Sequence, residues 1–327
     1  MSKVYSLKPV WRSSDPLPYK FIDGLPPEKE KDVICLFHDS WHIAARHSFK
    51  GLIINVFAGP GPNDIPLFKE LASKYKEKFL FTYSFAHPSR VKQESMETTV
   101  PIGHVEHLTI PGIPGVHHDV NNFDKDIILF PNRDLVSLMR ANSRQLGDIY
   151  NLKSAFIWIA TKLSQGSTKE FHIMSGLDQA DLDFRRCADL YQEFFSYDIT
   201  QCLLPFKSRI KIHKGFGWDE VLHLLSETKI MITALGTAGG TPREAAAYGI
   251  PNIGMSNDAS DLFFACPRYL YAPSLSETYF DLIEKLYTDK EYYTEVGSAY
   301  RDYVDQFYTY KAFTNNLFDI FQRRNML

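Results

Sequence analysis

Short apolar runs alternate with amphipathic stretches along most of the chain. Near the start, three runs have the length and composition of strands: residues 32–37 (DVICLF), 52–57 (LIINVF) and 79–85 (FLFTYSF). Between the second and the third run, residues 65–79 place apolar side chains at helical spacing. Strands that alternate with helices are typical of a parallel sheet covered on both faces. The pattern therefore predicts an α/β fold.

The alternation breaks once and then resumes. Residues 99–124 carry three prolines and three glycines without a long periodic element, which indicates a short strand and then an interdomain linker. We therefore expect a short first domain, residues 1–120, whose first thirty residues form an extended arm with little regular structure. A second, doubly wound domain, residues 121–305, and a C-terminal helix that returns towards the first domain, residues 306–327, should follow. The expected strands of the second domain are residues 126–133, 171–176, 209–215, 229–235 and 251–256. Its expected helices are residues 148–163, 182–195, 218–228 and 242–249, with two closing helices from Ser276 onward.

Composition narrows the classes of protein. A length of 327 residues suits two domains, and a net charge of -3 gives no global field for capturing nucleic acid or an anionic bilayer. The start of the chain lacks the apolar core of a signal peptide, and no apolar run approaches the ~20 residues of a membrane-spanning helix. The cysteines are far apart and form no CxxC pair, so we expect reduced thiols in a soluble cytoplasmic protein. They are Cys35, Cys187, Cys202 and Cys266.

One stretch, GTAGGTPREAAAYGIP (residues 236–251), carries the clearest candidate chemistry. It follows an apolar strand, and Pro242 suits the first position of a helix with Thr241 as its N-cap. Gly239 and Gly240 let the backbone approach a ligand closely. Free amides and the positive end of the helix dipole then form an anion site beyond the carboxyl end of a strand.

Glu244, in the same predicted helix, changes what this site would bind. A carboxylate repels phosphate but accepts hydrogen bonds from a pair of sugar hydroxyls, and phosphate beside a diol describes a nucleotide. On the loop residues alone, a tight strand-to-helix connection in which Glu244 caps the helix fits equally well, because a glycine-rich turn is a weak signal.

The order of the surrounding elements adds a resemblance. FPNR, GFGWDEVLHLL, KIMIT, GTAGGTPR, EAAAYGIP and NIGMS follow one another as in the donor-binding domain of the GT-B glycosyltransferases. From about residue 123 to residue 321 the chain resembles that domain, especially in the large retaining family 4. The non-hydrolysing UDP-N-acetylglucosamine 2-epimerases share this fold and have a similar Gly-Gly and Glu-Ala loop.

The resemblance implies a fold and an activity. The fold would be GT-B: two Rossmann-like doubly wound domains that face each other across a cleft, with a C-terminal helix that crosses back to the first domain. The activity would be a metal-independent transfer of a hexosyl or pentosyl group from a nucleotide-diphosphate donor, with UDP the expected nucleotide. Residues 1–120 would hold the acceptor: a glycan, a lipid-linked sugar or a modified base in DNA. The charge of -3 argues against DNA.

The resemblance also implies roles for single residues. Glu244 would hold the ribose hydroxyls, and Arg133 would neutralise the diphosphate as it leaves. The family's second glutamate and its lysine are replaced by Gly236 and Leu138, which leaves the donor contacts and the stereochemistry open. The expected donor-binding residues are Gly236, Thr237, Gly239, Gly240, Thr241 and Glu244.

Histidines of the first domain supply further catalytic candidates. His38 and Asp39 end a predicted strand and suit an acid–base or substrate-orienting role, although packing or capping fits them as well. His38 and His42 have the spacing of two metal ligands on a helix, but no further ligand is evident and no metal is expected. His87 follows another predicted strand, and its side chain would face either the donor sugar or solvent.

Two alternatives to the transferase stay open. An epimerase would use the same glycines and Glu244, but it needs acid–base carboxylates near the sugar ring that the sequence does not reveal. A non-catalytic nucleotide-sugar-binding protein would explain the missing glutamate and lysine.

Overall fold

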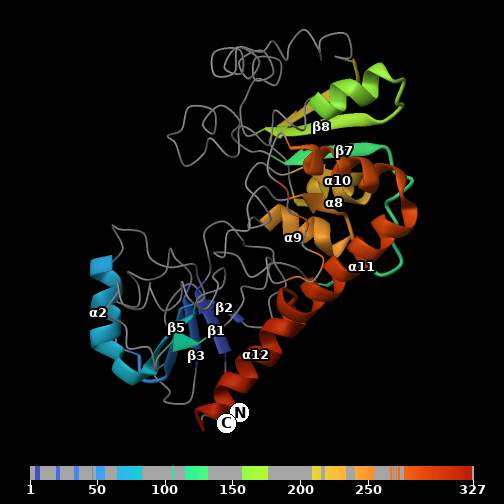
Figure 1. The fold of residues 1–327 in the computed structure, drawn as a ribbon. Helices are drawn as coiled ribbons and strands as arrows, with labels where there is room; N and C mark the ends of the chain where they lie inside the picture. The colour runs from blue at the N-terminus through green and yellow to red at the C-terminus, as the bar shows by residue number, and fades with distance from the viewer. Residues whose placement is uncertain are drawn as a thin grey trace. The chain divides into compact units, whose positions relative to one another are not determined.

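The chain divides into two units, each built on a parallel sheet (Figure 1). The first unit comprises Met1–Gly115, Ala259–Leu262 and Asp305–Leu327, and the second comprises Val116–Asp258 and Phe263–Val304. The structure is a computed structural model. It describes residues 4–7, 20–22, 33–36, 46, 49–55, 65–82, 105–106, 115–131, 157–175, 208–214, 218–232, 240–253, 266, 268, 270, 272 and 276–325.

The sheet of the first unit has six strands in the order β2-β1-β3-β4-β5-β6. All neighbouring pairs are parallel. Ile53, Leu71 and Phe79 are at most 1% exposed, so β4, α2 and β5 share one buried layer. The strands are β1 (Val4–Leu7), β2 (Lys20–Ile22), β3 (Val33–Leu36), β4 (Leu52–Asn55), β5 (Phe79–Thr82) and β6 (Val105–Glu106), with helix α2 (Ile65–Tyr75) and the 3-10 turn η2 (Lys76–Lys78) between β4 and β5.

The prediction that the first thirty residues form an extended arm is wrong for β1 and β2, which are strands of the sheet. β1 lies inside the sheet, with Val4 opposite Val33 of β3 and Tyr5 opposite Lys20 of β2. These strands are only four and three residues long and stand among prolines and charges, so they are too short to show an alternating pattern. Their stability comes from the neighbouring strands rather than from local preference.

The sheet of the second unit has the order β11-β10-β7-β8-β9, again with parallel pairs throughout. The chain starts in the middle at β7, moves outward through β8 and β9, and returns to the other side of β7 with β10 and β11. This is the strand order of a Rossmann fold. The strands are β7 (Ile127–Pro131), β8 (Glu170–Ser175), β9 (Ile210–Lys214), β10 (Thr228–Ile232) and β11 (Asn252–Ile253). They confirm the strands expected in this half of the chain.

Helices cover this sheet and close the chain. In Figure 1, α8, α9 and α10 gather beside β7, and α11 runs past them. The buried residues Leu129, Leu225, Met231 and Ala245 form one cluster that joins β7, α8, β10 and α9. The helices are α8 (Trp218–Ser226), α9 (Gly240–Ala247), α10 (Glu277–Thr288), α11 (Lys290–Phe307) and α12 (Tyr310–Arg323).

Three closing helices form where two were expected. Asp289 alone separates α10 from α11, and its Oδ1 accepts a hydrogen bond from the amide of Tyr292 (2.9 Å). No glycine or proline marks this break, so the sequence reads as continuous there. Thr309 caps α12 by accepting from the amide of Ala312 (3.2 Å). The segment Asp305–Leu327, which contains α12, belongs to the first unit by its contacts.

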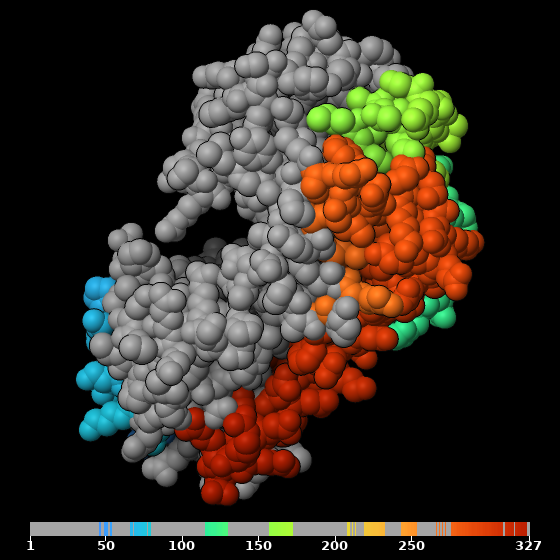
Figure 2. Space-filling view, viewed as in Figure 1, coloured from blue at the N-terminus to red at the C-terminus, as the bar shows by residue number. Residues whose placement is uncertain are grey.

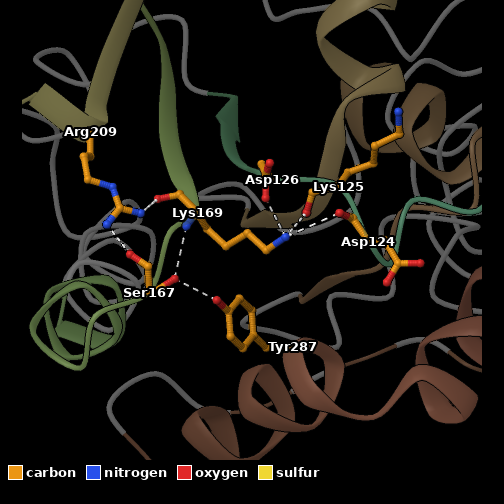
Figure 3. A network of polar contacts seen from close by, with 7 residues as sticks. All are labelled: Asp124, Lys125, Asp126, Ser167, Lys169, Arg209 and Tyr287. Atoms are coloured by element: carbon orange, nitrogen blue, oxygen red, sulfur yellow. Dashed lines mark hydrogen bonds and ion pairs between the residues drawn. The ribbon is translucent and has the colours of Figure 1, made fainter.

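A polar network covers the amino-terminal edge of the second sheet (Figure 3). The ammonium group of Lys169 lies 2.7 Å from Asp126 Oδ1 and accordingly joins the starts of β8 and β7. Arg209, just before β9, donates to the carbonyl oxygens of Ser167 and Lys169. Ser167 Oγ lies 2.8 Å from the hydroxyl of Tyr287 in α10. Side-chain contacts thus stabilise the edge of the sheet at which β7, β8 and β9 begin.

The helical residues 157–164 pack beside α10, as Figure 2 also shows. Lys162 forms an ion pair of 2.6 Å with Glu284 of α10, and the indole of Trp158 donates to the same carboxylate at 3.2 Å. These contacts fix α10 to the helix that precedes β8.

The neighbouring strands β8 and β9 share a row of polar side chains. Lys211 forms an ion pair of 2.6 Å with Glu170, and Glu170 also lies 3.2 Å from Nε2 of His172. Nδ1 of His172 lies 2.8 Å from Nε2 of His213. Burial lowers the pKa of both histidines, so the neutral pair is favoured.

Candidate functional site

The strand order of the second unit reverses between β7 and β10. These strands are neighbours, with Met231 opposite Leu129, but they are separated in sequence by β8 and β9. In open α/β sheets, ligands bind outside the carboxyl ends of the strands at such a reversal. β7 ends at Pro131 and β10 ends at Ile232, so the segments that leave these two residues border the expected binding place.

Both segments carry predicted site residues. Arg133 is the second residue after Pro131, and Gly236 to Gly239 lie between the end of β10 and the start of α9. The two motifs therefore follow strands that are neighbours in the sheet, although they are about a hundred residues apart in the chain. Arg133, Gly236, Thr237 and Gly239 themselves lie outside the residues that the structure describes.

Helix α9 begins earlier than expected. It starts at Gly240, so Thr241 and Pro242 are its second and third residues and Thr241 is not the N-cap. Proline fits there because the first amides of a helix have no partner within the helix. In general, the first amides of a helix can bind an anion, and the positive end of the helix dipole adds to the attraction.

Glu244 is the fifth residue of α9 and is only 6% exposed. A capping glutamate would occupy the third helical position, which Pro242 fills, so capping explains Glu244 less well than it did from the sequence. A carboxylate this deeply buried must be hydrogen-bonded or paired. The residues after it, from Ala245 to Ile250, are also buried, so the helix holds Glu244 on a rigid support.

The carboxyl end of α9 is fastened to the segment before β7. The amide of His117 donates to the carbonyl of Ala247 (2.9 Å), and the ring of His117 stacks on Tyr248 at 4.1 Å with an interplanar angle of 17°. Burial lowers the pKa of His117 and raises the pKa of Tyr248, so both rings are favoured in their neutral forms. This contact was not foreseen, because nothing in the sequence near His117 indicates a partner 131 positions away.

Arg301 of α11 completes this attachment. Its Nη1 donates to the carbonyls of Val120 (2.7 Å) and His117 (3.2 Å). The turn after α9 passes close beneath it at Gly249, whose φ of +71° suits glycine. Helix α9 is therefore fixed at its carboxyl end, and its amino end is directed toward the reversal of strand order.

The first unit offers a comparable place. Its sheet order reverses between β1 and β3, and β3 ends at Leu36. His38 and Asp39 follow within three residues, whereas His87 follows the end of β5 by five. These three residues, and His42, lie outside the described part of the chain, so their roles stay predictions.

The described residues contain no group of three His, Cys, Asp or Glu side chains that could hold a metal ion. No helix among them is long and apolar enough to cross a membrane.

Comparison with known proteins gives two negative results and one positive result. No protein-family model matches the sequence, and no curated protein matches it. Solved structures do match the fold. A Staphylococcus aureus TarM variant bound to fondaparinux, α-GlcNAc-glycerol and UDP superposes with a TM-score of 0.58 and 10% identity over 90% of this chain and 56% of that chain.

Two further structures give the same result. A glycosyltransferase from Rickettsia africae has a TM-score of 0.56 and 12% identity, covering 93% of this chain and 85% of that chain. S. aureus MnaA with UDP has a TM-score of 0.51 and 12% identity, covering 90% of this chain and 75% of that chain. This chain spans little more than half the length of TarM. The expected GT-B fold is confirmed.

Proposed function

We propose that this protein is a glycosyltransferase that takes a sugar from a nucleotide-diphosphate donor. One observation carries the proposal: Glu244 is buried in a helix that starts beyond β10, where the strand order reverses. The amino terminus of α9 suits a diphosphate and the carboxylate of Glu244 suits a ribose, so this helix can bind both parts of a nucleotide. The GT-B fold supports this assignment, and the TarM variant and MnaA were both solved with UDP.

Within this proposal, the residues at the reversal divide the work. The backbone of Gly239, Gly240 and Thr241 binds the diphosphate, with Gly236 and Thr237 in the same loop, and Glu244 accepts hydrogen bonds from the ribose hydroxyls. Breaking the glycosidic bond leaves negative charge on the terminal phosphate. The guanidinium of Arg133 neutralises that charge, which allows transfer without a metal ion.

The first unit then holds the acceptor. His38 and Asp39 follow β3 where its sheet reverses, so they are suited to orient an acceptor hydroxyl or to accept its proton. His87 would approach the donor sugar. We propose that a hexosyl or pentosyl group is transferred to a glycan or lipid-linked sugar, because the net charge of -3 disfavours DNA as the acceptor. The buried free thiol of Cys266 fits a reducing compartment, and we place the reaction in the cytoplasm.

An epimerase is the second candidate. The structural likeness to UDP-bound MnaA extends over 90% of this chain, and Gly239, Gly240, Glu244 and Ala245 form the Gly-Gly and Glu-Ala pattern of the nucleotide-sugar 2-epimerases. Such an enzyme would bind the same donor and change the sugar instead of transferring it.

One assay tests these functions together. The protein is incubated with UDP-, GDP- and dTDP-sugars in the presence of a chelator, and the nucleotide products are separated by chromatography. Slow release of nucleoside diphosphate supports the transferase and its independence of metal. Interconversion of two sugars with an intact diphosphate assigns the epimerase. Binding without turnover assigns a non-catalytic protein, and no binding of any nucleotide sugar overturns the proposal.

A further inference from the structure

Two connections between the units run close to the carboxyl end of α9. The chain enters the second unit after Gly115, and α11 leaves it after Val304 and continues across this boundary as one helix. We call these two places the entry connection and the exit connection. His117 is the second residue past the entry connection, and Arg301 lies three residues, nearly one helical turn, before the exit connection. Both residues contact α9 or the turn that follows it.

Arg301 ties the two connections to each other. Its Nη1 donates to the carbonyl of His117 at 3.2 Å and to the carbonyl of Val120 at 2.7 Å. A guanidinium stays charged at every physiological pH, and hydrogen bonds from a charged donor are stronger than those between neutral groups. The segment that enters the second unit is therefore fastened to the helix that leaves it.

The same two residues hold the carboxyl end of α9. The amide of His117 donates to the carbonyl of Ala247, the last residue of α9, at 2.9 Å, and its ring stacks on Tyr248 at 4.1 Å. A Cβ atom at Gly249 would lie 2.8 Å from Nη1 of Arg301, so the turn after α9 packs directly against the guanidinium. Because Tyr248 and Gly249 are buried, α9 cannot shift without disturbing the contacts to both connections.

Helix α9 is short and rigid enough to connect its two ends. Its eight residues rise about 12 Å in total, and the residues from Ala245 to Ile250 are buried in a close-packed interior. The proposed donor contacts lie at its amino end and at Glu244, whereas the contacts to the connections lie at its carboxyl end. A shift of one end of the helix therefore moves the other end.

We propose that Arg301 is a positioning residue that couples the donor site on α9 to the entry and exit connections. A nucleotide that holds the amino end of α9 in place stabilises the contacts at its carboxyl end, and by linkage those contacts raise the affinity for the nucleotide by the same factor. In a transferase the donor held by the second unit must meet an acceptor held by the first, so a tie between the donor site and the connections serves that reaction. The inference rests on the proposed function, because it takes Glu244 and the start of α9 as the nucleotide site.

Arg209 provides a matched control. Like Arg301, it is half-buried and donates to two backbone carbonyls, those of Ser167 and Lys169 (Figure 3). It lies just before β9, on the other side of β7 from β10. Arg209→Ala therefore removes a comparable pair of hydrogen bonds at a different place in the same unit. Arg301→Ala removes the proposed tie, and Arg301→Lys keeps a charged donor and serves as the conservative variant.

The amide of His117 reports on the coupling, because its hydrogen exchanges with solvent only when its bond to α9 opens. Labelling the full chain with amide-¹⁵N histidine leaves eleven histidine signals in the NMR spectrum, and His117→Gln assigns the one needed. Exchange is measured at fixed pH with and without saturating UDP, and calorimetry gives the affinity for UDP.

We expect UDP to slow the exchange of this amide at least about fivefold in the wild-type protein and in Arg209→Ala, but less than about twofold in Arg301→Ala. Arg301→Lys should lie between these values. UDP should bind to Arg301→Ala more weakly by no more than the factor by which it slows exchange in the wild-type protein.

The outcomes separate this inference from the proposed function. If the wild-type protein does not bind UDP, both are overturned. UDP binding that leaves the exchange of the His117 amide unchanged would overturn the inference alone. Equal slowing in Arg301→Ala and the wild-type protein, or loss of the slowing in Arg209→Ala, would do the same. If Arg301→Ala does not fold, Arg301→Lys carries the comparison.

Discussion

Gly297 of α11 lies directly against the carbonyl oxygen of Gly249, so close that a Cβ atom at position 297 would be 2.3 Å from that oxygen. The contact joins α11 to the turn that follows α9. A Cβ at Gly249 would in turn meet the guanidinium of Arg301 at 2.8 Å. Two glycines thus permit α11 to press on the base of the helix that carries Glu244.

Gly297→Ala should destabilise the protein by about 1–3 kcal/mol, because the new methyl group must displace backbone. Alanine would otherwise stabilise a helix by about 1 kcal/mol relative to glycine, so the sign of the change is diagnostic. Urea unfolding measures it. Gly115→Ala is the control, since a Cβ there meets no atom within 4 Å. A gain in stability for Gly297→Ala would show that the two helices are not pressed together.

Glu244→Gln should weaken binding of the nucleotide donor by about 1–3 kcal/mol, because an amide accepts hydrogen bonds from ribose hydroxyls less well than a carboxylate does. Calorimetry with UDP and with a 2′-deoxy analogue measures the loss. The variant should also discriminate less between the two nucleotides. Unchanged UDP affinity in a folded variant would remove Glu244 from the site.

Arg133→Lys should lower the rate of transfer by about tenfold to a hundredfold while donor affinity changes little. Lysine keeps the positive charge but loses the two-pronged geometry that suits a departing phosphate. Steady-state kinetics with separate kcat and KM values test this. If kcat stays constant and only KM rises, Arg133 holds the donor equally in the ground state and does not assist its departure.

The pair His172 and His213 should make stability fall in mild acid. Only one proton fits between Nδ1 of His172 and Nε2 of His213, and burial lowers the pKa of both rings below 6.5. The unfolded chain therefore binds more protons than the native state below that pH. The stabilisation is complete above pH 6.5 and is lost as pH falls through the native pKa values, with a slope of at most about 1.4 kcal/mol per pH unit for each histidine.

His213→Gln should flatten this dependence, because an amide donates to His172 Nδ1 without titrating. Unfolding free energies at pH 7.5 and 5.5 give the comparison. The exposed histidine of α8, changed by His223→Gln, serves as control and should retain the wild-type dependence. Parallel profiles for wild type and His213→Gln would assign the acid sensitivity to other groups.

The sequence predicted most of the sheet, for a physical reason. Strands buried on both faces read as apolar runs, as Ile230, Met231 and Ile232 do in β10, where every residue is buried. Short strands were missed: β1 and β2 depend on their neighbours in the sheet and have no pattern of their own. The order of motifs along the chain also led to the GT-B fold, which the solved structures confirm.

The contacts that hold helix α9 in place could not be predicted from local sequence patterns. The hydrogen bond from Arg301 to the carbonyl of His117 joins residues that are 184 positions apart. Its acceptor is a backbone atom, which every residue possesses, so no residue type marks the partner. The candidate donor motif, by contrast, stands out in the sequence because glycine and proline have conformational properties that other residues lack.

The contacts of His117 and Arg301 near the carboxyl end of α9 lie at the edge of the second sheet where the strands begin. The ion pair between Lys169 and Asp126 lies at the same edge. The chemistry proposed here belongs to the edge where they end. Substitutions in the loops after β7 and β10 can therefore alter which donor is accepted while the scaffold keeps its shape. Such a division allows the sequence of the binding loops to change without loss of the fold.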